Sequence, residues 1–208
     1  MTQLILIRHG ETIWNRERRM QGHSDSPLSE TGLRQAQMLA RRLKELEFKC
    51  LYCSDSGRAH HTARIVAELT GHPLIVEPRL RERHFGVFEG LTGLEIETQH
   101  PEAYLRFKSR DPHYRVPGGE SAAGFRDRAL ACLVEIAGRH TGEVVVIVTH
   151  GLVCDIAYRA AHGIELMARR DFDLVNAGLN RFRYEQEKWH IDAWGDAAHL
   201  AAELTTVT

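Results

Sequence analysis

The chain has 208 residues, of which 43% are apolar and 26% charged, which is an ordinary globular composition. Its 27 Lys and Arg against 28 Asp and Glu give a formal net charge of −1, which argues against a general nucleic-acid binder, because such a protein needs a basic excess. No apolar run approaches the roughly 18 residues that span a bilayer, and no signal peptide precedes the first apolar run, so we expect a soluble, cytoplasmic protein with no nucleic-acid or membrane partner.

Strands and helices are predicted to alternate along the chain, because short apolar runs alternate with segments of helical periodicity. We expect residues 1–200 to form a single domain and 201–208 a tail. In chain order we predict a strand at 4–7, a helix capped by Ser29, a strand at Cys50–Cys53, a helix over 59–69 closed by Gly71, a strand at Leu74–Val76, a helix capped by Ser121, a strand at 144–148, a helix at Gly151–His162, and a hairpin of Leu179–Glu185 with 188–193.

Apolar residues on one face of each predicted helix are expected to cover the strands. The strands at 4–7 and 144–148 are apolar throughout, which is typical of strands buried on both faces. The predicted fold is therefore an α/β three-layer sandwich with a mainly parallel central sheet flanked by helices. The expected apolar positions are Leu33, Ala36, Leu39, Ala40, Leu43 and Leu46, then Ala59, Thr62, Ala63, Val66 and Leu69, and then Phe125, Ala129, Cys132, Leu133 and Ile136.

The two most apolar strands end in the same way. The first is followed by Arg8-His9-Gly10 and the other by Thr149-His150-Gly151. Active sites of open parallel sheets lie beyond the carboxyl ends of the strands. If the two strands are near neighbours, the two imidazoles meet in one pocket, where one could attack an electrophile and the other could position it.

These residues belong to a series of blocks that resembles the histidine phosphatase superfamily, the phosphoglycerate-mutase-like enzymes. The blocks follow the order of that family and cover residues 3 to about 155. They are Arg8-His9-Gly10-Glu11-Thr12 with Asn15, Gln21-Gly22, Ser54-x-x-x-Arg58-Ala59-x-x-Thr62-Ala63, Leu80-Arg81-Glu82-x-x-Phe85-Gly86-x-x-Glu89-Gly90, Gly118-Gly119-Glu120-Ser121 and Thr149-His150-Gly151.

The resemblance implies a role for each of nine residues. His9 is implied to be the nucleophile that becomes phosphohistidine, and Glu82 the proton donor to the leaving group and then the base that activates water. Arg8, Arg58 and His150 are implied to form the phosphate pocket, and Asn15, Gln21, Gly22 and Gly151 to contribute to substrate binding. Since planar guanidinium groups can bind two phosphoryl oxygens at once, this set needs no metal and no cofactor.

Phosphatase and mutase activities are both open to such a chain. After Glu89-Gly90 it reads Leu91-Thr92-Gly93-Leu94, where the mutases usually carry Asn-Lys, and the mutase insertion with its paired Arg is absent between Arg110 and Val116. Residues 19–28 and 195–200 resemble the short bacterial broad-specificity phosphatases. We therefore expect a phosphomonoesterase of small phosphorylated metabolites, with phosphoglycerate mutase or a more specific enzyme such as α-ribazole phosphatase as alternatives. Dimers are common in the family, so a homodimer is open as well.

Other interpretations remain for single residues. Asn15 and Gln21 could cap or stabilise turns, and Glu82 could form a surface ion pair among three neighbouring arginines. The aromatic residues of segment 84–114 could form either the wall over the substrate or a local core. A phosphate-binding module without turnover and a metal-dependent hydrolase using His9, His150 and Glu82 are the competing functions, although the 13 histidines show no recognised metal-ligand spacing. The four cysteines are expected to be buried packing residues.

Overall fold

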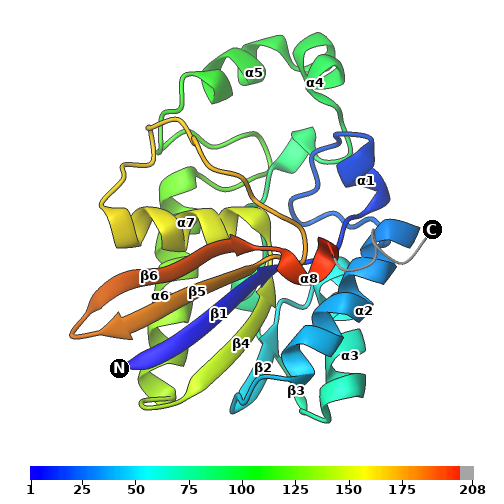
Figure 1. The fold of residues 1–208 in the computed structure, drawn as a ribbon. Coiled ribbons are helices and arrows are strands. Elements are labelled where there is room, and N and C mark those ends of the chain that lie inside the picture. Colours follow the sequence, from blue (N-terminus) through cyan, green and yellow to red (C-terminus); the bar gives the residue numbers. More distant parts are fainter. Residues whose placement is uncertain (202–208) are drawn as a thin grey trace.

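The computed structural model describes residues 1–201 and contains one six-stranded sheet with helices on both faces (Figure 1). The elements are β1 (Thr2–Arg8), α1 (Ile13–Arg16), α2 (Glu30–Lys44), β2 (Cys50–Cys53), α3 (Gly57–Thr70), β3 (Leu74–Val76), the 3-10 turns Pro78–Leu80 and Gly86–Phe88, α4 (Gly93–Gln99), α5 (Pro101–Lys108), α6 (Ala122–Arg139), β4 (Val144–Thr149), α7 (Gly151–His162), β5 (Leu179–Glu185), β6 (Lys188–Asp196) and α8 (Ala198–Ala201).

The sheet has the order β3-β2-β4-β1-β5-β6. The first four of these strands run parallel to one another, whereas β5 pairs antiparallel with β1 and with β6. The mainly parallel sheet predicted from the sequence is therefore confirmed, with an antiparallel hairpin at one edge. Strands β1 and β4 are direct neighbours in register from Gln3↔Val144 to Arg8↔Thr149.

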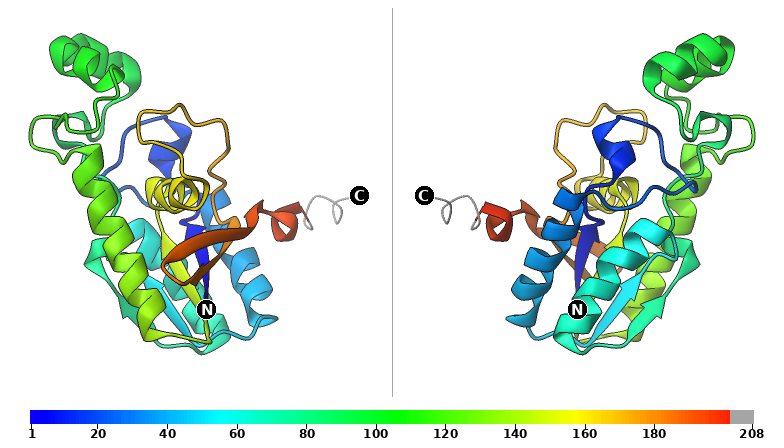
Figure 2. Two further views of the ribbon diagram at one scale, coloured as in Figure 1. Left: turned by 90° about the vertical axis from the view of Figure 1, so that its left-hand side faces the viewer. Right: turned by 90° about the vertical axis from the view of Figure 1, so that its right-hand side faces the viewer.

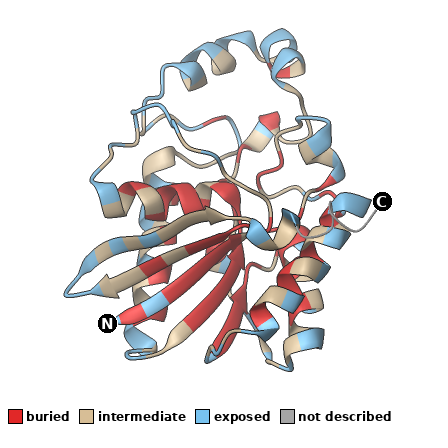
Figure 3. Cartoon of the chain, in the orientation of Figure 1, coloured by how far each residue is buried: buried red, intermediate tan, exposed pale blue. Residues whose placement is uncertain are grey.

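Successive residues of the central strands point to opposite faces and enter two separate cores. On one face Leu4, Leu6 and Ile147 pack with residues of α6 and α7, and on the other Ile7 and Val148 pack with residues of α2 and α3. Figure 2 shows α6 and α2 on opposite sides of the sheet, and Figure 3 shows that β1 and β4 are buried along most of their length. Burial on both faces explains why these runs are continuously apolar.

Most predicted helix ends are confirmed by their caps. The Ser29 side chain accepts from the Gly32 N–H, the Ser121 side chain accepts from the Gly124 N–H, and Gly71 ends α3 in the left-handed conformation. Two details differ from the expectation. Leu69, in the last turn of α3, is 39% exposed, and Leu46 lies beyond the end of α2 at Lys44.

Helices α4 and α5 were not predicted, and they stand apart from the sheet at its carboxyl end (Figures 1 and 2). The capping box of Thr92 and Glu95 starts α4, and Pro101 starts α5, so local signals for both helices are present in the sequence. Phe85 and Phe88 form a small separate core with side chains of this region. Tyr104, Phe107 and Tyr114 pack against this core, and Phe85, Phe107 and Tyr114 also line a cavity described below, so both alternatives left open for this segment are present.

Two further expectations concern the ends and surface of the chain. The predicted tail at 201–208 lies, apart from Ala201 in α8, outside the described residues. No helix within residues 1–201 is long and apolar enough to cross a membrane.

Candidate active site

The carboxyl ends of β1 and β4 bring His9 and His150 together. The backbone N–H of His9 donates to the Thr149 carbonyl at 3.0 Å, which continues the pairing of the two strands by one residue. The two imidazole rings lie edge to face with centroids 5.4 Å apart. The sequence analysis predicted that the two imidazoles would meet if the two strands were neighbours. The strands are neighbours, and this prediction is confirmed.

Hydrogen bonds fix the tautomer of His9. Nδ1 lies 2.8 Å from the Gly10 carbonyl oxygen, which can only accept, so Nδ1 carries the proton. Nε2 is then the basic nitrogen, and it accepts from Nε of Arg58 at 3.2 Å. The lone pair of a buried imidazole thus points at a guanidinium group. In His150, Nε2 lies 2.9 Å from the Ser54 hydroxyl, while Nδ1 is buried and has no hydrogen-bond partner within the described residues 1–201.

Both imidazoles are held in the neutral form. Burial, followed by the positive charges of Arg58 and Arg8, keeps the pKa of His9 well below its usual value. Burial and the charge of Arg58 likewise keep the pKa of His150 well below its usual value. A neutral imidazole retains the lone pair that a nucleophile needs.

Arg58 is a fully buried cation in the first turn of α3, with 1% of its surface exposed. Its terminal nitrogens donate to the Gly22 and Ser24 carbonyls at 2.8 and 2.9 Å and to the Asp25 carboxylate at 2.9 Å. Asp25 also accepts from the Arg58 backbone N–H at 3.2 Å, so it caps α3 from a distant loop. Because the fork is held on three sides, its Nε has one defined direction, toward His9.

The loop that holds Arg58 is itself held by Glu89. The Glu89 carboxylate accepts from the backbone N–H groups of His23, Ser24 and Phe85 and from the Ser24 hydroxyl, at 2.7 to 2.9 Å. Burial opposes its ionisation, but these hydrogen bonds prevail and lower the pKa of Glu89. Gly22 has a φ of +58°, and a Cβ at this position would lie 2.0 Å from Glu89 Oε1. A side chain at position 22 is therefore excluded.

Arg8 is the last residue of β1 and directly precedes His9. Its Nη1 donates to the Leu174 carbonyl at 2.6 Å, whereas its Nε is buried and has no hydrogen-bond partner in the part of the chain that the structure describes. A Cβ at Gly151 would lie 3.3 Å from Leu174 Cδ1 and 3.5 Å from this Nε, so the first residue of α7 lies close to both side chains. An unpartnered Nε beside His9 is a free donor for an anion.

Glu82 is 9% exposed and is therefore not a surface ion-pair residue. Its carboxylate accepts from the backbone N–H of Arg83 at 2.9 Å and from that of Leu152, at the start of α7, at 3.0 Å. Burial raises the pKa of Glu82, and these hydrogen bonds and the charges of Arg58 and Arg8 oppose the rise without cancelling it. A raised pKa favours a carboxyl group that can give up and take back a proton.

Asn15 and Gln21 are tied together through Thr12. The Thr12 N–H donates to Asn15 Oδ1 and the Thr12 hydroxyl donates to Gln21 Oε1, both at 3.1 Å. The capping role left open for Asn15 is thus present in the structure. Since both amide oxygens are occupied by Thr12, the amide NH₂ groups are the ends that remain for a ligand.

A family model described as the histidine phosphatase superfamily, branch 1, matches residues 4–197. The chain belongs to the histidine phosphatase superfamily. It is 41% identical to "Phosphoglycerate mutase-like protein 4" of Arabidopsis thaliana over 95% of this chain and 86% of that protein. It is 40% identical to "Metal-independent phosphoserine phosphatase" of Arabidopsis thaliana, over 97% of this chain and 84% of that protein. The solved structure of Bacillus stearothermophilus YhfR matches with a TM-score of 0.87 and 38% identity, over 96% of this chain and all of the other.

Membership in the histidine phosphatase superfamily confirms the resemblance stated from the sequence blocks, and the match to the solved YhfR structure agrees with the α/β fold predicted from the alternation of strands and helices. Within residues 1–201 no group of three or more His, Cys, Asp or Glu is arranged to hold a metal ion. The four cysteines are free and buried, as expected. Burial raises the pKa of Cys154, one turn along α7, to about 12, so its thiol stays protonated in the core.

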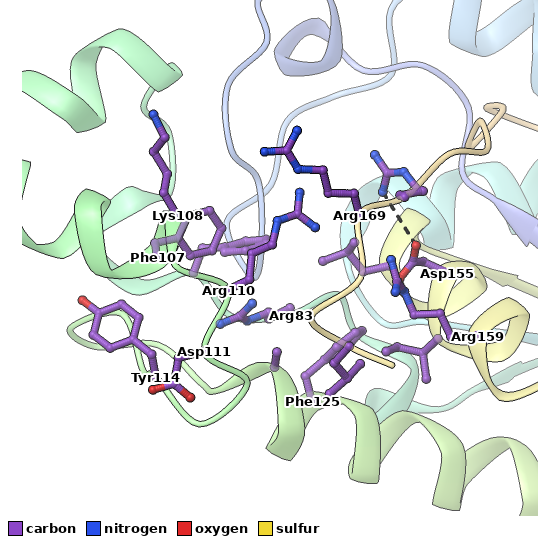
Figure 4. A pocket seen from close by; sticks show the side chains of 16 residues that line it. Arg83, Phe107, Lys108, Arg110, Asp111, Tyr114, Phe125, Asp155, Arg159 and Arg169 are labelled. Carbon is purple, nitrogen blue, oxygen red and sulfur yellow. Dashed lines mark hydrogen bonds and ion pairs between the residues drawn. The ribbon is translucent and has the colours of Figure 1, made fainter. Parts of the chain in front are cut away.

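One feature of this superfamily member was missed from the sequence. A cavity of about 510 Å³ lies beside Glu82 and is lined by residues of segment 83–125 and of α7 with the segment that follows it (Figure 4). Its lining includes six cationic side chains and two carboxylates, drawn from parts of the chain far apart in sequence, whereas the sequence analysis noted only that the Asn-Lys pair and the paired-Arg insertion of the mutases are absent. The cations are Arg83, Lys108, Arg110, Arg159, Arg169 and Arg170.

Proposed function

We propose that this protein is a metal-independent phosphomonoesterase that hydrolyses small phosphorylated metabolites through a phosphohistidine on His9. The observation that carries the proposal is the pairing of a neutral, buried imidazole with a fixed guanidinium, Nε2 of His9 with Nε of Arg58 at 3.2 Å. Phosphoryl transfer requires an in-line nucleophile and cations around the equatorial oxygens, and this pair supplies one of each.

The phosphoryl group would lie among the donors around His9. Arg8 and Arg58 supply guanidinium donors, and Nδ1 of His150 can donate when the Ser54 hydroxyl donates to its Nε2. The amide groups of Asn15 and Gln21 can add donors from the Thr12 network. We place Gly22 and Gly151 beside the pocket, because a Cβ at Gly22 would lie 2.0 Å from Glu89 Oε1 in the contacts that hold the loop around Arg58, and a Cβ at Gly151 would contact Leu174 and Arg8.

The reaction then takes two steps. In the first, Nε2 of His9 bonds to phosphorus as the ester P–O bond breaks, and the Glu82 carboxyl gives its proton to the departing oxygen. In the second, the Glu82 carboxylate takes a proton from water as the water oxygen attacks the phosphorus. The P–N bond breaks, inorganic phosphate leaves, and His9 is neutral again. The raised pKa of Glu82 supports both halves of this exchange.

The test of the proposal is direct detection of phosphohistidine. The protein is mixed with p-nitrophenyl phosphate, quenched in alkali and analysed by peptide mass spectrometry for acid-labile phosphate on His9. The His9→Ala protein is the blank, and a chelator is present in one arm. Chelator-resistant hydrolysis with phosphate on His9 supports the proposal. A fully active His9→Ala protein without acid-labile phosphate would overturn it, and activity restored by one divalent ion would favour a metal-dependent hydrolase.

Phosphoglycerate mutase activity is the second candidate, because the cationic cavity beside Glu82 suits a substrate with a second acidic group. The two activities separate in one assay of 3-phosphoglycerate with catalytic 2,3-bisphosphoglycerate. Free phosphate favours the phosphatase, and rapid interconversion of phosphoglycerates with little free phosphate favours the mutase. A more specific activity, such as α-ribazole phosphatase, would be found in a screen of phosphate release. The cytoplasmic location and the homodimer stay predictions.

A further inference from the structure

Glu82 lies in a stretch of irregular backbone. Residues 81–85 connect the 3-10 turns Pro78–Leu80 and Gly86–Phe88 and belong to no helix or strand. In the proposed reaction the Glu82 carboxyl group gives a proton to one oxygen and takes a proton from another, so it needs a fixed position. Because no helix or strand ladder fixes the main chain here, that position depends on the side chains that bind the backbone.

Four successive carbonyl groups at this point, those of residues 79–82, accept hydrogen bonds from side chains. Arg128 donates through Nη1 to the carbonyls of residues 79 and 81 at 2.8 and 3.0 Å, and through Nη2 to the Glu82 carbonyl at 3.3 Å. The Leu80 carbonyl accepts from the buried Thr149 hydroxyl at 2.8 Å. One guanidinium group from α6 therefore binds three of the four carbonyls, including that of Glu82 itself. Bonds from a charged donor are stronger than those between neutral groups.

Arg128 is itself held by Glu120, which directly precedes the cap of α6. Nη2 of Arg128 lies 2.6 Å from Glu120 Oε1, and the same oxygen accepts from the His84 backbone N–H at 2.9 Å. The backbone of Glu120 takes part as well, since its carbonyl accepts from Nε of Arg83 and its N–H donates to the His84 carbonyl. Glu120 thus holds the main chain that follows Glu82, and it orients the guanidinium that holds the main chain before it.

The glycines of the block at 118–121 allow this close approach. A Cβ at Gly119 would lie 2.6 Å from the His84 carbonyl oxygen and 3.0 Å from the backbone nitrogen of Gly86. Only a residue without a side chain lets the two backbone segments come this near. The block ends at the cap of α6, so Arg128 lies about two turns into that helix. The sequence analysis quoted this block as part of the resemblance without assigning a role to it.

We propose that Arg128 is a positioning residue for the proton donor Glu82, and that Glu120 acts with it. The assignment rests on the proposed function, since it takes Glu82 to be the group that protonates the leaving group. The charge of Arg128 is paired with Glu120, and its hydrogen bonds reach the main chain of Glu82, so it acts through the position of the backbone. His9 and Arg58 are held by other residues and keep their hydrogen bonds without it.

The test compares two esters of similar shape, phenyl phosphate and p-nitrophenyl phosphate. Phenolate needs a proton as it departs, whereas p-nitrophenolate needs little protonation, so a displaced acid is costly mainly for phenyl phosphate. Arg128→Gln should lower kcat/KM for phenyl phosphate by about tenfold or more, and clearly less for p-nitrophenyl phosphate. Arg128→Lys should recover part of the loss, because it keeps the charge but lacks the fork. Arg126→Gln, on the same helix with a side chain 43% exposed, is the matched control and should change neither value.

A double-mutant cycle separates positioning from a general loss of structure. If Arg128 acts through Glu82, adding Arg128→Gln to the Glu82→Gln protein should leave the ratio of the two kcat/KM values unchanged. Glu120→Gln keeps an amide oxygen for the His84 N–H but removes the charge that pairs with Arg128. It should show the same dependence on the leaving group, and it carries the test if thermal unfolding shows that Arg128→Gln is not folded.

Two results would overturn the assignment while Glu82→Gln itself still discriminates between the esters. One is an equal loss for both esters in Arg128→Gln and in Glu120→Gln. The other is a further change of the ratio when Arg128→Gln is added to Glu82→Gln. An equal loss for both esters in Glu82→Gln would instead remove Glu82 as the acid, and the assignment with it. Failure of the phosphohistidine step is seen separately, because it is measured as phosphate on His9.

Discussion

Nε of Arg58 donates to Nε2 of His9 across 3.2 Å, so the cation and the nitrogen expected to attack phosphorus are joined by one hydrogen bond. The bond keeps the lone pair of His9 Nε2 directed at the guanidinium of Arg58. For attack to occur, the Nε–H of Arg58 must release Nε2 of His9 and donate to a phosphoryl oxygen instead. The same donor would then stabilise the charge that develops on the transferring group.

The first prediction concerns the shape of that cation. Arg58→Lys keeps the charge but loses the fork that reaches Gly22, Ser24 and Asp25, so the nucleophile is no longer oriented. We expect kcat for p-nitrophenyl phosphate to fall by about 10² to 10³. Steady-state kinetics provide the measurement. Arg64→Lys, on an exposed turn of the same helix, is the matched control, and equal activity of the two variants would contradict the assigned role.

A second prediction follows from Glu82 as the proton donor. Glu82→Gln cannot protonate an alkoxide, so kcat/KM for an alkyl phosphate such as glycerol 3-phosphate should fall by about 10² to 10⁴. The loss should be smaller for p-nitrophenyl phosphate, whose leaving group needs little protonation. Rapid-mixing experiments should then reveal a burst of p-nitrophenol, because hydrolysis of the phosphohistidine becomes the slow step. A uniform loss for both substrates without a burst would exclude Glu82 as the acid.

The third prediction concerns Glu89, which holds the loop around Arg58 without contacting the phosphate site. Glu89→Gln removes the charge that accepts four hydrogen bonds from His23, Ser24 and Phe85. Because the loop then loses its anchor, we expect kcat to fall by about tenfold or more, with a smaller change in KM. Glu97→Gln, exposed on α4, should behave as wild type. Unchanged kcat in Glu89→Gln would show that the loop needs no such anchor.

The fourth prediction concerns stability against pH. The pKa of His9 is lower in the folded than in the unfolded protein, where it is about 6.5. Below pH 6.5 the unfolded chain binds a proton at His9 that the folded protein does not bind, so acid favours unfolding. Above this pH the titration of His9 has no effect on the free energy of unfolding. The wild-type free energy of unfolding should therefore decrease between pH 6.5 and 5 more steeply than that of His9→Gln, by about 1.4 kcal/mol per pH unit.

Urea denaturation over a pH series measures this difference. Glu82 has the opposite sign, because its raised pKa stabilises the folded state at low pH and the effect is lost as pH rises through the folded pKa. Glu82 is present in both proteins, as is His150, so their contributions largely cancel in the comparison. Parallel pH profiles for wild type and His9→Gln would mean that His9 is not held neutral by the fold.

The sequence by itself determined the strands, the sheet layers and the blocks of the active site. A strand buried on both faces must be apolar throughout. The sequences Arg-His-Gly and Thr-His-Gly come directly after the two apolar runs that form β1 and β4. These features are local, so that a short stretch of sequence carries each of them. Helices α4 and α5 also had local signals, in the capping box of Thr92 and Glu95 and in Pro101.

Only the tertiary structure decided how Arg58 is aimed and what lies beyond Glu82. Gly22 and Asp25 hold the guanidinium and Glu89 holds their loop, and none of these contacts has a sequence spacing that would predict it. The cationic cavity is likewise assembled from Arg83, Arg110 and Arg169, which lie far apart along the chain. Their electrostatic effect depends on distance in space, and the sequence specifies that distance only through the fold as a whole.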